Sequence, residues 1–314
     1  MKLIYPIEIK AKLDEHVVGQ DEAKTALSVA IFEHQMRCQF PELQMDKSNV
    51  FLIGPSGSGK TILVETLAGI ADVPFSINSA TSLTESGYVG EDVENVLRRL
   101  LEASEYDLEK AEKGIVFIDE FDKIARKSKE NMSITRDVGG EGVQQALLRI
   151  IEGCDIEVPL TSGRRHPYEE CIVMNTENIL FILSGAFEGI KCQEESITPQ
   201  DLIAYGMLHE LVGRVPVIAE VEPLDIEELK RIMTEPKNAI IPQFKALFRQ
   251  MDIDLEFSDG AVSEIAASAY FRGTGARGLR SFIEKLLQSY IFSVEKYQGE
   301  TITIEALDVL GIAA

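Results

Sequence analysis

Residues 54–61 of this chain read Gly54-Pro55-Ser56-Gly57-Ser58-Gly59-Lys60-Thr61. The spacing matches GxxxxGK[ST], the pattern of a phosphate-binding loop whose glycines let backbone N–H groups turn toward phosphate oxygens. A short apolar run over 49–53 precedes the loop, and a helical pattern over 60–69 follows it. A buried strand, this loop and a helix N-terminus in that order predict an α/β nucleotide-binding domain.

The loop residues have expected tasks in binding ATP. We expect Lys60 to reach the β- and γ-phosphates and the Thr61 hydroxyl to hold Mg²⁺. Ile62, at the start of the following helix, completes the expected nucleotide contacts. The alternative is a structural glycine-rich turn, which the flanking strand and helix disfavour.

Two adjacent carboxylates follow a second apolar strand. The run over 115–118 ends at Asp119 and Glu120, and α/β sheets place their ligands at this carboxyl edge. We expect Asp119 to orient Mg²⁺ or its bound water, and Glu120 to act as the general base toward the attacking water. An acidic pair alone is usually a solvated turn, but beside a phosphate loop it favours hydrolysis over nucleotide binding alone.

The composition narrows the possible partners. Lys plus Arg number 31 and Asp plus Glu 52, which gives a net charge of −21. This charge repels phosphate backbones and argues against a nucleic-acid motor. The four cysteines form no CxxC pair, which argues against a zinc site of that type and fits a reducing, cytoplasmic environment. No apolar run is long enough to span a membrane.

Strands and helices alternate through the first two thirds of the chain. Such alternation predicts a parallel sheet covered by helices on both faces. Beyond residue 221 the pattern changes to helices over 226–234, 238–249, 260–271 and 276–296, with strands over 253–257 and 301–304. We therefore predict a large α/β domain over 1–221 and a smaller α+β domain over 222–314.

Other segments carry a more specific pattern. An aromatic residue between glycines, Gly87-Tyr88-Val89-Gly90, suits a mobile gripping loop better than a core strand. Further segments are Val17-Val18-Gly19-Gln20, Ser133-Ile134-Thr135-Arg136-Asp137-Val138, Gly142-Val143-Gln144-Gln145-Ala146-Leu147 and Thr274-Gly275-Ala276-Arg277-Gly278-Leu279-Arg280. Together with the phosphate loop and the acidic pair, they resemble the ClpX family of AAA+ protein unfoldases over nearly the whole chain.

The resemblance implies a homohexameric ring with ATP and Mg²⁺ bound between subunits. Arg214 would be an arginine finger that reaches a neighbour's γ-phosphate, where a guanidinium stabilises transition-state charge. Arg277 would sense the nucleotide in the small domain, and Val17 and Val18 would line the adenine pocket. Without the resemblance, either arginine is more simply interpreted as a surface ion pair.

Three loops would face the pore through which a protein substrate is threaded. Tyr88 and Val89 would grip the polypeptide, and a second loop would run near 134–140. The third is a basic cluster in an acidic chain, which could steer substrate carboxylates, and it contains Arg164, Arg165 and His166. The simpler interpretations are a half-buried strand tyrosine and an ordinary solvated basic turn.

The chain departs from the family pattern in two places. Compared with the family, we expect the N-terminal zinc-binding domain to be missing, and only a short acidic segment separates Phe187 from a predicted helix at Pro199. No Ile/Leu-Gly-Phe/Leu tripeptide occurs in the chain, so the apolar anchor for docking on ClpP is expected to be absent. The leading prediction is a protein unfoldase independent of ClpP. The alternatives are a regulatory ATPase of a ClpP-type protease and a nucleotide-dependent scaffold with little turnover.

Overall fold

The computed structural model describes residues 3–84, 91–125, 140–160, 171–192 and 196–313. The chain forms two compact units. The first comprises Met1–Lys10, Asp21–Pro55 and Lys60–Val221, and the second comprises Ala11–Gln20, Ser56–Gly59 and Glu222–Ala314. The predicted boundary after residue 221 divides the chain in the same region, but residues 11–20 and 56–59 cluster with the second unit rather than the first.

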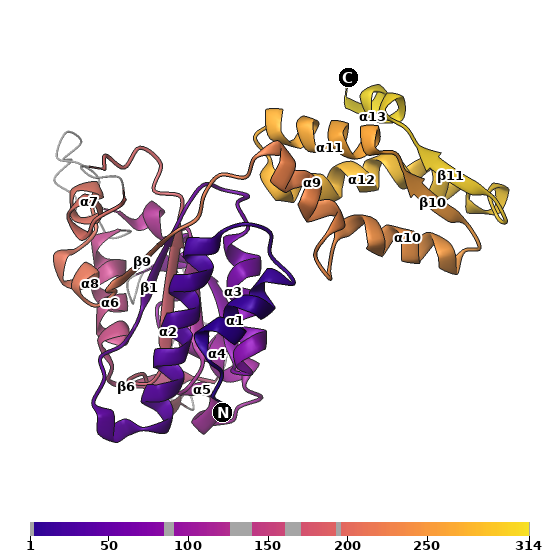
Figure 1. Ribbon diagram of the computed structural model, residues 1–314. Coiled ribbons are helices and arrows are strands. Elements are labelled where there is room, and N and C mark those ends of the chain that lie inside the picture. The colour runs from indigo at the N-terminus through magenta and orange to yellow at the C-terminus, as the bar shows by residue number, and fades with distance from the viewer. Residues whose placement is uncertain (1–2, 85–90, 126–139, 161–170, 193–195, 314) are drawn as a thin grey trace. The chain divides into compact units, whose positions relative to one another are not determined.

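The first unit is built on a five-stranded parallel sheet with the strand order β2-β5-β8-β1-β9. Every residue of β1 and β8 is buried, because helices cover both faces of the sheet (Figure 1). This arrangement confirms the predicted parallel sheet. Its strands are β1 (Val50–Ile53), β2 (Phe75–Ser79), β5 (Ile115–Asp119), β8 (Leu180–Gly185) and β9 (Val217–Glu220).

Helices and short strands surround this sheet. The helices are α1 (Pro6–Asp14), whose last residues belong to the second unit, α2 (Asp21–Gln39), α3 (Lys60–Ala71), α4 (Asn95–Ala103), α5 (Leu108–Ala111), α6 (Glu141–Glu152), α7 (Pro199–Tyr205) and α8 (His209–Gly213). The short strands are β3 (Leu83–Thr84), β4 (Glu91–Asp92) and the antiparallel pair β6 (Asp155–Pro159) and β7 (Cys171–Asn175). In the described part of the chain, no helix is long and apolar enough to cross a membrane.

The second unit has its own apolar core and a two-stranded parallel sheet. Its first helix begins with a capping box, in which the side chains of Asp225 and Glu228 each accept a hydrogen bond from the other's backbone N–H. Its elements are α9 (Ile226–Thr234), α10 (Ile240–Gln250), β10 (Asp254–Phe257), α11 (Asp259–Phe271), α12 (Gly275–Phe292), β11 (Thr301–Ile304) and α13 (Ala306–Ala313).

Several predicted bounds differ from the observed ones for local reasons. The last strand of the sheet, β9, begins only at Val217, since Pro216 has no N–H to donate to the sheet. The helix predicted over 276–296 ends at Phe292, and a turn of 3₁₀ helix follows over Val294–Lys296. The hairpin of β6 and β7 was not predicted, although Ile156 and Val158 alternate with acidic residues as in a half-buried strand.

Candidate nucleotide site

The phosphate loop leaves the carboxyl end of β1 and enters α3 at Lys60. Gly57 and Gly59 have φ values of 80° and 95°, a backbone region that side chains other than glycine rarely adopt. Gly54 has an ordinary φ, but a Cβ there would collide with the carbonyl oxygen of Val221. The motif therefore needs glycine for two different reasons, which are backbone conformation and close approach.

Lys60 is nearly buried, at 8% exposure, and its ammonium group contacts the loop itself. Its Nζ donates to the carbonyl oxygens of Gly54 at 2.6 Å and Pro55 at 2.8 Å. The ammonium is thus already held at the loop, where a phosphate would also be bound. Thr61 follows in the first turn of α3 and is partly exposed.

Asp119 ends β5, which lies next to β8 in the sheet. Its Oδ1 accepts hydrogen bonds from the backbone N–H of Glu120 at 2.9 Å and from the Ser184 hydroxyl at 3.0 Å. Both bonds go to the same oxygen, so Oδ2 keeps its capacity to accept a bond from a metal-bound water. Ser184 was not among the predicted site residues, but a polar residue at the carboxyl end of a neighbouring buried strand is a signal for one.

Glu120 adopts a left-handed backbone conformation, with φ 57° and ψ 31°. Non-glycine residues in this region are uncommon and cluster at functional sites. Its Oε2 accepts hydrogen bonds from the hydroxyls of Ser79 at 2.9 Å and Thr81 at 3.0 Å. Ser79 ends β2, so residues from β2 and β5 together orient this carboxylate. Sequence reasoning missed Ser79 and Thr81, because their link to Glu120 depends on strand order.

Asp122 contacts the carboxyl end of β8. Its side chain is buried, its Oδ1 accepts from the backbone N–H of Ala186 at 3.2 Å, and its Oδ2 forms an ion pair with Lys123 at 2.9 Å. A Cβ at Gly185 would lie 2.6 Å from Asp122 Oδ1, so glycine is required there. The contact fixes the turn that follows Ser184.

Arg214 lies at the opposite end of the sheet from the phosphate loop. The Asn49 side chain, just before β1, donates to the carbonyl oxygen of Arg214 at 2.8 Å, whereas the loop begins just after β1. At about 3.3 Å per residue, the strand separates the two by about 15 Å, beyond the reach of one arginine side chain. Arg214 therefore cannot contact a phosphate in its own loop.

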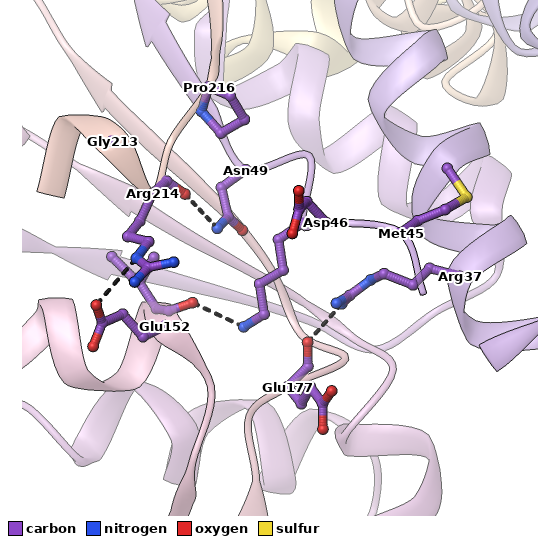
Figure 2. A pocket seen from close by; sticks show the side chains of 11 residues that line it. Arg37, Met45, Asp46, Asn49, Glu152, Glu177, Gly213, Arg214 and Pro216 are labelled. Atoms are coloured by element: carbon purple, nitrogen blue, oxygen red, sulfur yellow. Dashed lines mark hydrogen bonds and ion pairs between the residues drawn. The ribbon is translucent and has the colours of Figure 1, made fainter. Parts of the chain in front are cut away.

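Arg214 lines a cavity of about 370 Å³. Its guanidinium donates through Nε to Glu152 Oε1 at 3.0 Å (Figure 2). Both side chains are exposed. The cavity is lined by Arg37, Met45, Asp46, Lys47, Asn49, Ile151, Glu152, Glu177, Gly213, Arg214 and Pro216.

The predicted adenine contacts belong to the second unit. Val17 and Val18 are buried, and the next two residues, Gly19 and Gln20, have φ values of 64° and 61°. The Gln20 amide fixes this turn because its Nε2 donates to the carbonyl oxygen of Glu222 at 2.9 Å, while its Oε1 accepts from the N–H of that residue at 2.8 Å.

Arg277 and the tip of the phosphate loop, 56–59, also belong to the second unit. The backbone N–H of Ala276 donates to the carbonyl oxygen of Gly57 at 3.1 Å. Arg277 follows directly, in the first turn of α12. The start of this helix therefore packs on the tip of the loop.

The predicted pore residues lie outside the described residues. These are Tyr88, Val89, Arg164, Arg165 and His166, together with nearly all of the second loop. β3 and β4 flank the first of these segments along the chain, and β6 and β7 flank the segment with the basic cluster. Their roles stay predictions.

Two family models match consecutive parts of the chain. The AAA domain (Cdc48 subfamily) matches residues 45–218, and the C-terminal, D2-small domain of ClpB protein matches residues 224–298. A protein from Treponema denticola named ATP-dependent Clp protease ATP-binding subunit ClpX is 48% identical over 325 residues. The alignment covers 94% of this chain and 78% of the relative. The AAA+ ATPase fold that the resemblance implied is confirmed, and the chain belongs to the ClpX family of AAA+ ATPases.

Proposed function

We propose that this protein is an ATP-dependent unfoldase that works as a homohexameric ring and threads protein substrates through its pore. The placement of Arg214 and the phosphate loop at opposite ends of β1 supports this proposal most directly. A subunit with this layout supplies a catalytic loop at one edge and an arginine at the other. A ring of identical subunits joins each loop to a neighbour's arginine.

Within one subunit, the described residues suit the binding of ATP with magnesium. Residues 54–62 would hold the phosphates, with Lys60 exchanging its contacts with Gly54 and Pro55 for phosphate oxygens. The Thr61 hydroxyl and the Asp119 carboxylate are hard oxygen donors of the kind that Mg²⁺ prefers. Bound there, the ion would neutralise phosphate charge during hydrolysis.

The hydrolytic step would depend on Glu120 and on a neighbour's Arg214. Glu120, oriented through Oε2 by two hydroxyls, keeps Oε1 for a proton of the attacking water. The neighbour's guanidinium would stabilise the charge that develops on the γ-phosphate. Val17, Val18 and Arg277 would hold the base and sense the phosphates.

The mechanical step would be performed by the segments around Tyr88 and Arg164–His166. A large aromatic residue can press on any polypeptide without reading its sequence, and a basic cluster attracts acidic segments. We further propose that this activity does not require ClpP. Only residues 188–198 separate Phe187 from α7, and they contain no apolar anchor of the docking type.

A second candidate function is a regulatory ATPase of a ClpP-type protease. The printed name of the Treponema denticola relative favours it, because that protein is named as a subunit of the Clp protease. A third, a scaffold with little turnover, is disfavoured by the oriented Glu120 carboxylate.

Co-assembly with a ClpP peptidase distinguishes these candidate functions. The chain would be mixed with ClpP and a slowly hydrolysed ATP analogue, and the mass would be measured by light scattering. A hexamer that stays separate from ClpP, together with ATP-dependent unfolding of a tagged fluorescent protein, is the expected result. A joint complex would instead establish the protease regulator, and absence of turnover would favour the scaffold.

A further inference from the structure

Arg214 is held at both its backbone and its side chain. Asn49, which is 1% exposed, donates to the Arg214 carbonyl oxygen at 2.8 Å and accepts from the N–H of Phe181 at 3.0 Å. Glu152 Oε1 accepts from Arg214 Nε at 3.0 Å. The arginine is therefore fixed in the isolated subunit, before any neighbour or nucleotide is present.

The hydrogen bond to Nε determines which face of the guanidinium stays available. Arginine carries five N–H donors in a planar fork. With Nε bonded to Glu152, the four donors on the two terminal nitrogens form an end face that suits two phosphate oxygens at once. Figure 2 shows this Nε contact, with Asn49 beside the backbone of Arg214.

The position of Glu152 is itself fixed by the segment that leads into β1. Glu152 is the last residue of α6. The Lys47 Nζ donates to the carbonyl oxygens of Ile151 at 2.9 Å and Thr176 at 2.6 Å. Burial lowers the pKa of Lys47 to about 7, as expected for an ammonium group enclosed by the protein. Two residues of the short segment before β1 therefore support Arg214. Asn49 holds its backbone directly, and Lys47 acts indirectly by fixing the position of Glu152.

Stability alone does not account for the pair of Glu152 and Arg214. Their side chains are 41% and 58% exposed, and exposed ion pairs contribute little to folding. A pair of this kind can be removed without unfolding the domain, so its effect on activity can be measured separately.

We infer that Glu152 is a positioning residue for Arg214, which orients the end face of the guanidinium toward the nucleotide of a neighbouring subunit. The inference rests on the proposed function, in which Arg214 acts across the subunit interface. It adds a residue that neither touches nucleotide nor lies in the phosphate loop, and that acts only through the arginine.

The first test compares single variants in ATP turnover. Glu152→Ala should lower kcat about tenfold, since one hydrogen bond to a charged group is lost at a half-exposed position, and should leave KM for ATP nearly unchanged. Glu152→Gln keeps an acceptor for Nε and should retain most of kcat. Glu177→Ala is the matched control, because it removes a carboxylate from the same cavity and should turn over like the wild type. Wild-type turnover by Glu152→Ala would overturn the inference.

The second test uses mixed hexamers and separates a positioning role from a purely structural one. Glu120→Gln subunits lack the general base but supply an intact Arg214. A one-to-one mixture with Glu152→Ala should place about a quarter of the interfaces in the productive arrangement and recover about that share of wild-type turnover. A mixture of Glu152→Ala with Arg214→Ala should recover nothing beyond the first variant's own activity.

Two failures can be told apart. In the first, the mixture of Glu152→Ala with Glu120→Gln turns over ATP no faster than the average of the two variants, whereas Arg214→Ala does recover activity with Glu120→Gln. Glu152 would then act within its own subunit, and only the inference would be overturned. If Arg214→Ala also shows no recovery with Glu120→Gln, the arginine does not act across the interface. The proposed function and the inference would then both be wrong.

Discussion

Removal of the two hydroxyls that hold Glu120 should slow ATP hydrolysis without weakening ATP binding. The Glu120 Oε2 accepts from Ser79 at 2.9 Å and from Thr81 at 3.0 Å. These bonds orient a carboxylate whose backbone is in the uncommon left-handed region. The combined Ser79→Ala and Thr81→Val variant frees the side chain to rotate, and none of these changes touches the phosphate loop.

The size of the effect follows from the two bonds. A hydrogen bond to a charged group contributes about 1.5–3 kcal/mol when buried. Both hydroxyls are exposed, so about 0.5–1 kcal/mol each is the appropriate scale. If the transition state depends on the full orientation of the carboxylate, the loss is about 1–2 kcal/mol, which lowers kcat about tenfold. Each single variant should lower kcat about threefold.

Steady-state turnover with a coupled ADP assay measures kcat and KM separately, and a fluorescent ATP analogue measures binding. Thr25→Val is the matched control, since the Thr25 hydroxyl donates to the carbonyl oxygen of Asp21 in its own helix. The expected result is a lower kcat with unchanged KM and binding. A kcat within twofold of the wild type for the double variant would refute the reasoning, because the two hydroxyls would then have no part in orienting the base.

Three further predictions concern other parts of the chain. Glu120→Gln should bind ATP as the wild type does but lose turnover, and comparable turnover would remove Glu120 from the role of general base. Tyr88→Ala should reduce the unfolding rate of a tagged substrate far more than ATP turnover, and equal losses would argue against a gripping role. His34 is fully buried, and burial lowers its pKa from 6.5 to about 4. Because only the unfolded chain takes up a proton between these values, stability is lost as the pH falls from 6.5 toward 4. The free energy of unfolding falls by about 2 kcal/mol by pH 5. A urea midpoint that falls with pH as much in His34→Gln as in the wild type would contradict this prediction.

The sequence predicted those parts of the site that are contiguous in the chain. The phosphate loop and its flanking strand and helix were predictable because the motif specifies backbone conformation, and Gly57 and Gly59 have the positive φ values that it requires. Asp119 and Glu120 were predictable because an apolar strand ends at them.

Residues that join the site through the strand order were not predictable. Ser79 is the last residue of β2 and Ser184 the last but one of β8, the two strands that flank β5 in the sheet. A polar residue near the carboxyl end of a strand is a general signal, but nothing local indicates that these strands are neighbours. Asn49 and Glu152 escaped notice for the same reason. Each is an ordinary polar residue in the sequence, and only the packing of β1 and α6 places it next to Arg214.

The structure of β1 limits where motion during ATP hydrolysis can occur. The strand is fully buried and hydrogen-bonded to β8 on one side and β9 on the other, and such packed elements do not deform continuously. We therefore expect the start of the phosphate loop, Gly54 and Pro55, to move together with Asn49, which supports Arg214 at the other end of the strand. Rearrangements that follow hydrolysis are then confined to segments outside the sheet. The turn at Gly19 and Gln20, with two successive positive φ values, lies outside the sheet. A rearrangement there would break the two hydrogen bonds between Gln20 and Glu222 but no strand contact.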